Sequence, residues 1–141
     1  MRRDLLILAA AVVLLRLPFI ALPVQGDDVY YLLFAENALS DPWHALQMGF
    51  PLQGETVWAA GHTRPPFNAY WLALLMVLFG PPGEVAYHAV YILFSLGALG
   101  SMYFLARRFR APPLLSAFAL MAVPSFVVNG NKLEADLPLL T

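Results

Sequence analysis

Residues 85–106 read VAYHAVYILFSLGALGSMYFLA, and residues 107–110, which follow directly, read RRFR. The first of these stretches contains no acidic side chain and, apart from His88, no basic one. A helix of about 22 residues is ~33 Å long at 1.5 Å per residue, which exceeds the ~30 Å hydrocarbon core of a bilayer. Residues 85–106 therefore predict a membrane-spanning helix, and the arginines predict that it ends on the cytoplasmic side.

The composition places the whole chain in the membrane class. Hydrophobic residues make up 60% of the 141 residues and charged residues 12%, about half the charged share of an ordinary soluble domain. The net charge is −1, so the chain lacks the excess of basic residues that is typical of nucleic-acid-binding proteins. The absence of cysteine excludes disulfides and cysteine-ligated metals.

Two further apolar blocks, 5–24 and 113–129, predict a first and a third span. A cleaved signal peptide is the alternative for the first block, but the block is long and no small-x-small cleavage site precedes Gly26. Arg16 lies inside this block, and a charged side chain facing lipid is costly. We expect Arg16 to snorkel or to face a partner, for example in the remainder of a longer protein. For the same reason we expect His88 to meet a polar neighbour.

Residues 25–83 form a long loop between the first two spans, and we expect short helices in it. Asp28 to Leu39 predicts a helix with an aromatic, apolar face that lies in the headgroup region. The apolar block at 66–80 offers about 14 helical residues, or ~21 Å, which is too short to span. A span there would also place the basic residues at 2–3 and 107–110 on opposite sides of the membrane. This contradicts the charge rule, by which basic residues close to membrane spans stay on the cytoplasmic side. The block is therefore interpreted as interfacial or re-entrant.

This topology places two acidic groups on one outer face: Asp27 with Asp28, after the first span, and Glu134 with Asp136, after the third. Acids at helix starts commonly cap free N–H groups, so capping is the alternative for each pair taken alone. Residues 137–141 have the composition of a fourth span beginning, and we expect the chain to be the N-terminal part of a longer protein. The predicted fold class is an all-α integral membrane protein with three transmembrane helices.

Four segments of the chain resemble, in order, the motifs of a known family. They are Gly26-Asp27-Asp28-Val29-Tyr30-Tyr31; His62-Thr63-Arg64-Pro65-Pro66 with Trp71 and Leu78-Phe79-Gly80; Arg107-Arg108-Phe109; and Glu134-Ala135-Asp136-Leu137-Pro138. The family is that of the polytopic glycosyltransferases of the C-type fold, which includes the protein mannosyltransferases and the aminoarabinose transferases of lipid A. Together the four segments cover nearly the whole chain. Their occurrence in the family's order is more specific than any one of the segments alone.

The resemblance implies transfer of a sugar from a polyprenyl-phosphate carrier to an acceptor at the extracytoplasmic face of a membrane, expected to be a bacterial inner membrane. The basic clusters predict that the N-terminus lies in the cytoplasm. It gives Asp27 or Asp28 the role of positioning or deprotonating the acceptor hydroxyl, which needs a nearby base. It places Asp136 near the donor phosphate, where Asp136 and Asp28 would hold a divalent metal such as Mg²⁺ or Mn²⁺. The implied partners are the lipid bilayer and the lipid-linked donor, while the sugar and the acceptor stay open.

Two departures from the family's pattern affect the expected substrate-binding residues. Asp28 stands where Glu is usual, and Glu134 stands where Arg is common. The second departure would move the phosphate-binding charge to Lys132, beside Glu134, or to Arg64, and His62 is a further candidate for a polar contact with the donor. We expect the isolated chain to be inactive, since a transferase site must enclose both substrates. The alternative function is a non-catalytic polytopic membrane protein, a transporter or an assembly subunit, whose acids only cap helices.

Overall fold

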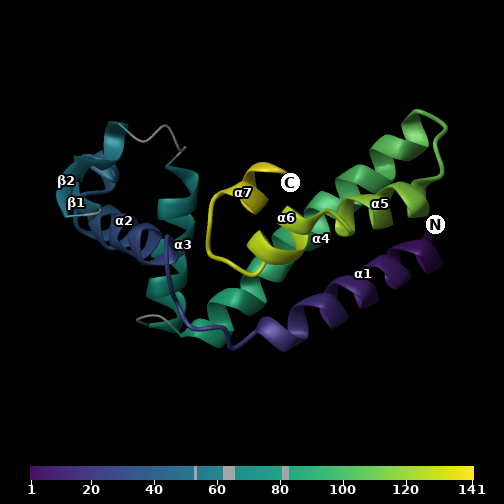
Figure 1. The fold of residues 1–141 in the computed structure, drawn as a ribbon, viewed down its shortest axis with the longest axis horizontal. Helices are drawn as coiled ribbons and strands as arrows, with labels where there is room; N and C mark the ends of the chain where they lie inside the picture. Colours follow the sequence, from purple (N-terminus) through teal and green to yellow (C-terminus); the bar gives the residue numbers. More distant parts are fainter. Residues whose placement is uncertain (53, 62–65, 81–82) are drawn as a thin grey trace. The chain divides into compact units, whose positions relative to one another are not determined.

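A computed structural model describes residues 1–52, 54–61, 66–80 and 83–141 of the chain. The chain divides into two compact units (Figure 1). The bundle unit comprises Met1–Pro23 and Glu84–Thr141, and the loop unit comprises Val24–Gly83. The limits of the loop unit coincide within a residue with those of the long loop expected between the first two spans.

The bundle unit is built of helices. Its elements are α1 (Arg2–Arg16), the 3-10 turn η1 (Leu17–Phe19), α4 (Glu84–Arg108), α5 (Pro113–Met121), α6 (Pro124–Asn129) and α7 (Asp136–Leu139). The helix predicted over 85–106 is confirmed by α4. Among the helices that the structure describes, α4 is the one that is long and apolar enough to cross a membrane, judged by length and composition.

Neither of the other two predicted spans is one continuous α-helix. In the first block the α-helix ends at Arg16, and only the turn η1, which contains Pro18, extends it. In the block 113–129, a break at Val123 separates α5 from α6. Val123 is extended (φ −65°, ψ 127°) because the ring of Pro124 disfavours the α conformation in the preceding residue, and Pro124 has no N–H to continue the helix.

Within the bundle unit, α1 and α4 run antiparallel and are joined near both ends of α1. The Tyr103 hydroxyl donates to Asp4 Oδ2 at 2.7 Å, and Arg16 Nε donates to Ser95 Oγ at 3.2 Å. Two apolar clusters fill the space around these contacts: Leu8, Tyr103 and Ala117 in one, and Val12, Ala98, Leu99, Phe126 and Leu137 in the other. Arg107 Nη1 lies 2.9 Å from Met1 Sδ, so the basic residues at 2–3 and 107–110 share one end of this unit, as the charge rule predicts.

Arg16 is buried, with 3% of its surface exposed, and its partners belong to the same chain. Its Nη1 and Nη2 donate to the carbonyl oxygens of Val127 and Phe126, at 3.1 and 2.7 Å. These carbonyls lie in the last turn of α6, where helical partners run out. Arg16 therefore faces polar partners, which is one of the two alternatives expected for it, and it does not snorkel. These partners lie in the described chain and not in the remainder of a longer protein. His88 has the polar neighbour predicted for it, because its Nε2 lies 3.0 Å from the Leu22 carbonyl oxygen.

We expect Arg16→Ala to lower the free energy of unfolding by about 2–4 kcal/mol, because hydrogen bonds to a charged group are strong and the Phe126 carbonyl loses its Arg16 donor. Gly130→Ala should cause a loss of the same kind, since a methyl group there would collide with the Arg16 guanidinium and the Phe126 carbonyl. Denaturant unfolding in detergent, followed by circular dichroism, measures both. Arg2→Ala, at an exposed position, is the control and should change stability by less than about 0.5 kcal/mol. Equal stability of the Arg16 and Arg2 variants would contradict this account.

The loop unit contains two helices and a hairpin. In chain order its elements are α2 (Asp28–Ser40), the 3-10 turn η2 (Pro42–His44), β1 (Gly49–Leu52), β2 (Glu55–Trp58), the 3-10 turn η3 (Ala59–Gly61) and α3 (Phe67–Phe79). The helix predicted from Asp28 to Leu39 is confirmed within one residue. α3 has 13 residues, which is about 20 Å of helix, so the short helix predicted in 66–80 is also confirmed.

The hairpin corrects the predicted all-α fold to a mostly helical one. β1 and β2 pair antiparallel, with Phe50 opposite Val57 and Leu52 opposite Glu55. Gly54, at the turn, has φ +90°, a backbone conformation that glycine adopts without a steric penalty. The hairpin matters for function because it brings Phe50 against α2, and α2 in turn packs on α3.

Candidate functional site

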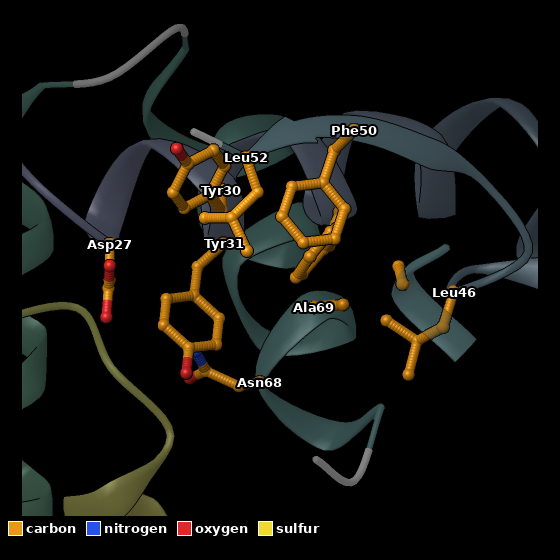
Figure 2. A pocket seen from close by; sticks show the side chains of 10 residues that line it. Asp27, Tyr30, Tyr31, Leu46, Phe50, Leu52, Asn68 and Ala69 are labelled. Atoms are coloured by element: carbon orange, nitrogen blue, oxygen red, sulfur yellow. The ribbon is translucent and has the colours of Figure 1, made fainter. Parts of the chain in front are cut away.

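The loop unit contains a cavity of about 270 Å³, lined by side chains from α2, the hairpin and α3. Figure 2 shows these side chains from close by. The lining residues are Asp27, Tyr30, Tyr31, Phe34, Leu46, Phe50, Leu52, Ala59, Asn68 and Ala69. All ten belong to the loop unit, so this unit forms the cavity by itself.

Aromatic rings from α2 and β1 form one wall of the cavity. Tyr30 and Phe34 are four residues apart and therefore lie on the same face of α2. The ring of Phe50, which is buried, contacts both of them, with centroid distances of 5.0 Å to Tyr30 and 5.2 Å to Phe34. Tilted and edge-on pairs at such distances are favourable contacts. The helix and the hairpin thus hold each other in place around the cavity.

The turn at Gly26 positions the carboxylate of Asp27 at this cavity. Gly26 has φ +61°, a left-handed conformation that suits glycine and turns the chain into α2. The carbonyl oxygen of Asp27 accepts hydrogen bonds from the N–H groups of Tyr30 and Tyr31, at 3.0 and 3.3 Å, so its backbone begins the helix. Its side chain, however, makes no cap hydrogen bond with α2 and is exposed, and Figure 2 shows it at the edge of the cavity. Helix capping therefore does not account for this carboxylate.

Asp28 has a different environment from its neighbour. Its side chain is fully buried, at 0% exposure, and does not line the cavity. Successive residues of a helix point about 100° apart, so a helix start that directs Asp27 to the cavity directs Asp28 elsewhere. Of the two acids that the sequence offers as a base, Asp27 is the one that a molecule in the cavity can reach.

Asn68 is a cavity residue that the sequence analysis does not single out. It lies in the first turn of α3 and is 2% exposed. Figure 2 shows its amide and the Tyr31 hydroxyl directed to the same side of the cavity. Asn68 could have been noticed in the sequence as the one amide in the apolar block 66–80. An amide buried in such a block needs polar contacts, which makes it a candidate site residue.

The other predicted site residues that the structure describes lie in the bundle unit. Lys132 Nζ donates to Glu134 Oε1 at 3.0 Å, and Glu134 is buried, with 7% exposed. The positive charge of Lys132 is therefore offset by its neighbour. Asp136 is exposed at the start of α7 and lines a second cavity, of about 370 Å³, together with Ser125 and Asn129.

The remaining predictions concern residues or distances that the structure does not describe. His62 and Arg64 lie outside the described residues. Convergence of Asp27 and Asp136 on one site joins the two units and stays a prediction, as does a metal shared by Asp28 and Asp136. Within residues 1–52, 54–61, 66–80 and 83–141, no group of three or more His, Asp or Glu side chains is arranged to hold a metal ion.

The chain matches no protein-family model, and no similar curated protein or solved structure was found. A membrane-type helix and a cavity occur in many functional classes, so neither identifies the function alone.

If Asp27 does not cap α2, Asp27→Ala should leave the free energy of unfolding within about 0.5 kcal/mol of wild type, whereas the loss of a true cap costs about 1 kcal/mol. Asn37→Ala is the contrast, because Asn37 Nδ2 donates to the carbonyls of His44 and Ala45, both at 3.0 Å. Its removal should cost about 1–2 kcal/mol. Hydrogen exchange of the α2 amides measures both changes. A loss at Asp27→Ala as large as that at Asn37→Ala would restore capping as the role of this acid.

Proposed function

We propose that this chain is part of a glycosyltransferase that takes a sugar from a polyprenyl-phosphate carrier and acts at the extracytoplasmic face of a membrane. The observation that carries the proposal is the Asp27 carboxylate, which does not cap α2 and stands at the edge of an aromatic cavity. A helix cap needs no cavity, whereas a base that acts on a bound substrate needs one. The ordered resemblance of four segments supports the same function, and Asp27 belongs to the first of them.

In the proposed reaction Asp27 is the general base. Its carboxylate accepts the proton of an acceptor hydroxyl while the hydroxyl oxygen forms a bond to the anomeric carbon of the sugar. The bond between that carbon and the phosphate oxygen breaks, and the polyprenyl phosphate leaves with the electron pair. Because Asp27 is exposed, it can pass the proton to solvent afterwards. Asp28, buried at the start of α2, is proposed to support the helix rather than to touch a substrate.

The departing phosphate needs positive charge. Lys132 is a weaker source than its sequence position suggests, because its ammonium group is paired with Glu134. Arg64 is therefore the preferred candidate, with His62 as a polar contact. Asp136 keeps its expected place near the donor, and the cavity that it lines is compatible with an apolar segment of the lipid carrier.

We also propose that the bundle unit is embedded in the membrane, with its arginine-rich end in the cytoplasm. α4 crosses the bilayer, and the segments α1–η1 and α5–α6 are the two further crossings. Backbone groups left free where a helix ends within a membrane must be satisfied by neighbouring groups, and Arg16 does this for the last turn of α6. α3 exposes Leu74, Val77 and Leu78 and is proposed to lie at the outer interface.

The orientation can be tested by cysteine labelling, since the chain has no cysteine of its own. A membrane-impermeant thiol reagent added outside should react with Glu55→Cys, at an exposed position on β2, and should not react with Phe109→Cys, which replaces a side chain that is 73% exposed. Phe109→Cys should react once the membrane is permeabilised. Labelling of position 109 in intact cells would overturn the topology.

The catalytic assignment can be tested in the complete enzyme. Asp27→Asn keeps the shape of the side chain but removes the base, and should lower the rate of transfer by about 10²–10⁴-fold. Asp136→Asn should also strongly lower the rate of transfer, because Asp136 is proposed to lie near the donor. The measurement is the incorporation of labelled sugar from a polyprenyl-phosphate donor by membranes that contain equal amounts of each variant.

The matched control is Glu36→Gln, because Glu36 is an exposed acid on α2 that does not line the cavity. It should transfer sugar at the wild-type rate. Wild-type rates for both Asp27→Asn and Asp136→Asn would reject the transferase assignment and leave the non-catalytic alternative.

A further inference from the structure

The charge of the loop-unit cavity limits what can bind there. Among its described lining residues there is one acid, Asp27, and no Arg, Lys or His. A phosphate brought beside Asp27 would be repelled and would find no cation in this lining. The described part of the lining therefore offers a phosphate no positive charge, and it favours a neutral or cationic group that donates a hydrogen bond.

The lining also limits the body of the ligand. Among the described lining residues, all but Asp27 and Asn68 have aliphatic or aromatic side chains, and the hydroxyls of Tyr30 and Tyr31 are the other polar groups. A saccharide or a peptide backbone carries many donors and acceptors, and each one left without a partner in such a site is costly. An apolar chain has no such requirement. The lining thus favours a lipid over a polysaccharide or a peptide segment.

The volume sets the length of the bound segment. An apolar cavity of about 150 Å³ accommodates benzene, which is about 25 Å³ per non-hydrogen atom. At that ratio the cavity, of about 270 Å³, holds about eleven non-hydrogen atoms. This is the size of one short alkyl or isoprenoid segment with a small head group.

We propose that this cavity binds the hydroxyl-bearing end of a lipid acceptor. The apolar segment packs between the rings of Tyr30, Phe34 and Phe50 and the start of α3, and the hydroxyl donates to the Asp27 carboxylate. The ligand's role as acceptor rests on the proposed function, whereas its binding does not. The lipid-linked donor, with its phosphate, binds elsewhere.

Photoaffinity labelling of the full chain in phosphatidylcholine nanodiscs tests the proposal. Three probes carry the same eight-carbon chain with a diazirine and end in a hydroxyl, an ammonium or a carboxylate group. The alcohol and the amine should label peptides that contain cavity residues, identified by mass spectrometry. The carboxylate should label them at least about fivefold less, which corresponds to ~1 kcal/mol at 1.4 kcal/mol per tenfold, the repulsion of two like charges ~4 Å apart in water.

Variants of the chain separate charge from packing. Asp27→Asn should abolish the discrimination against the carboxylate probe. Leu46→Trp, which fills the cavity from its loop side, should reduce labelling by all three probes while circular dichroism shows an unchanged fold. Glu36→Gln, on the same helix as the aromatic wall but outside the cavity, should label like wild type.

Equal labelling by the alcohol and carboxylate probes in wild type, or labelling unaffected by both Asp27→Asn and Leu46→Trp, would overturn the proposal. Displacement of the alcohol probe by an apolar serine-containing peptide, but not by octanol, would assign the site to a peptide and reject the lipid. Because transfer is not part of the readout, the two proposals fail separately. Binding with no effect of Asp27→Asn on transfer rejects only the catalytic role, and lost transfer without cavity labelling rejects only this inference.

Discussion

The burial of Arg16 is the constraint on which the bundle unit depends. A guanidinium group that is 3% exposed needs acceptors, and it finds a hydroxyl on α4 and two carbonyls on α6. Those carbonyls are available because α6 ends at Asn129, which leaves the carbonyls of its last turn without intrahelical donors. A cation near the C-terminal end of a helix also interacts favourably with the helix dipole. The broken third segment and the buried charge therefore satisfy each other, and Gly130 leaves the room that the guanidinium needs.

The long helix α4 could be predicted from the sequence, whereas its environment could not. An apolar run of spanning length between a proline-rich turn and three arginines defines one helix with little ambiguity. The break at Pro124 was also readable, because proline inside a helical pattern ends or kinks the helix, but the apolar run of 113–129 suggested continuity. The need of Arg16 for a partner follows from its burial cost alone. The identity of that partner does not, since the carbonyls lie 110 or more residues away along the chain.

In the loop unit the two helices follow from local patterns, and the cavity between them does not. The hairpin strands have only four residues each, too few for a clear alternation, and their pairing creates the contact of Phe50 with Tyr30 and Phe34. Without that contact the sequence offers Tyr30 as one more aromatic residue near a membrane surface. A sequence motif also cannot decide whether Asp27 or Asp28 faces the cavity. The choice depends on which residue begins α2, because a shift of one residue would exchange the buried and the exposed carboxylate.

A transferase that uses a lipid phosphate has two electrostatic requirements that oppose each other. The acceptor hydroxyl must meet an unpaired carboxylate, and the phosphate must meet positive charge. The described residues meet the first requirement within the loop unit, where the described cavity lining holds Asp27 and no Arg, Lys or His. They do not meet the second with Lys132, whose charge Glu134 offsets. The proposed function therefore requires another cation at the donor side. Arg64, in the second of the four segments quoted from the sequence, is the residue proposed to supply it.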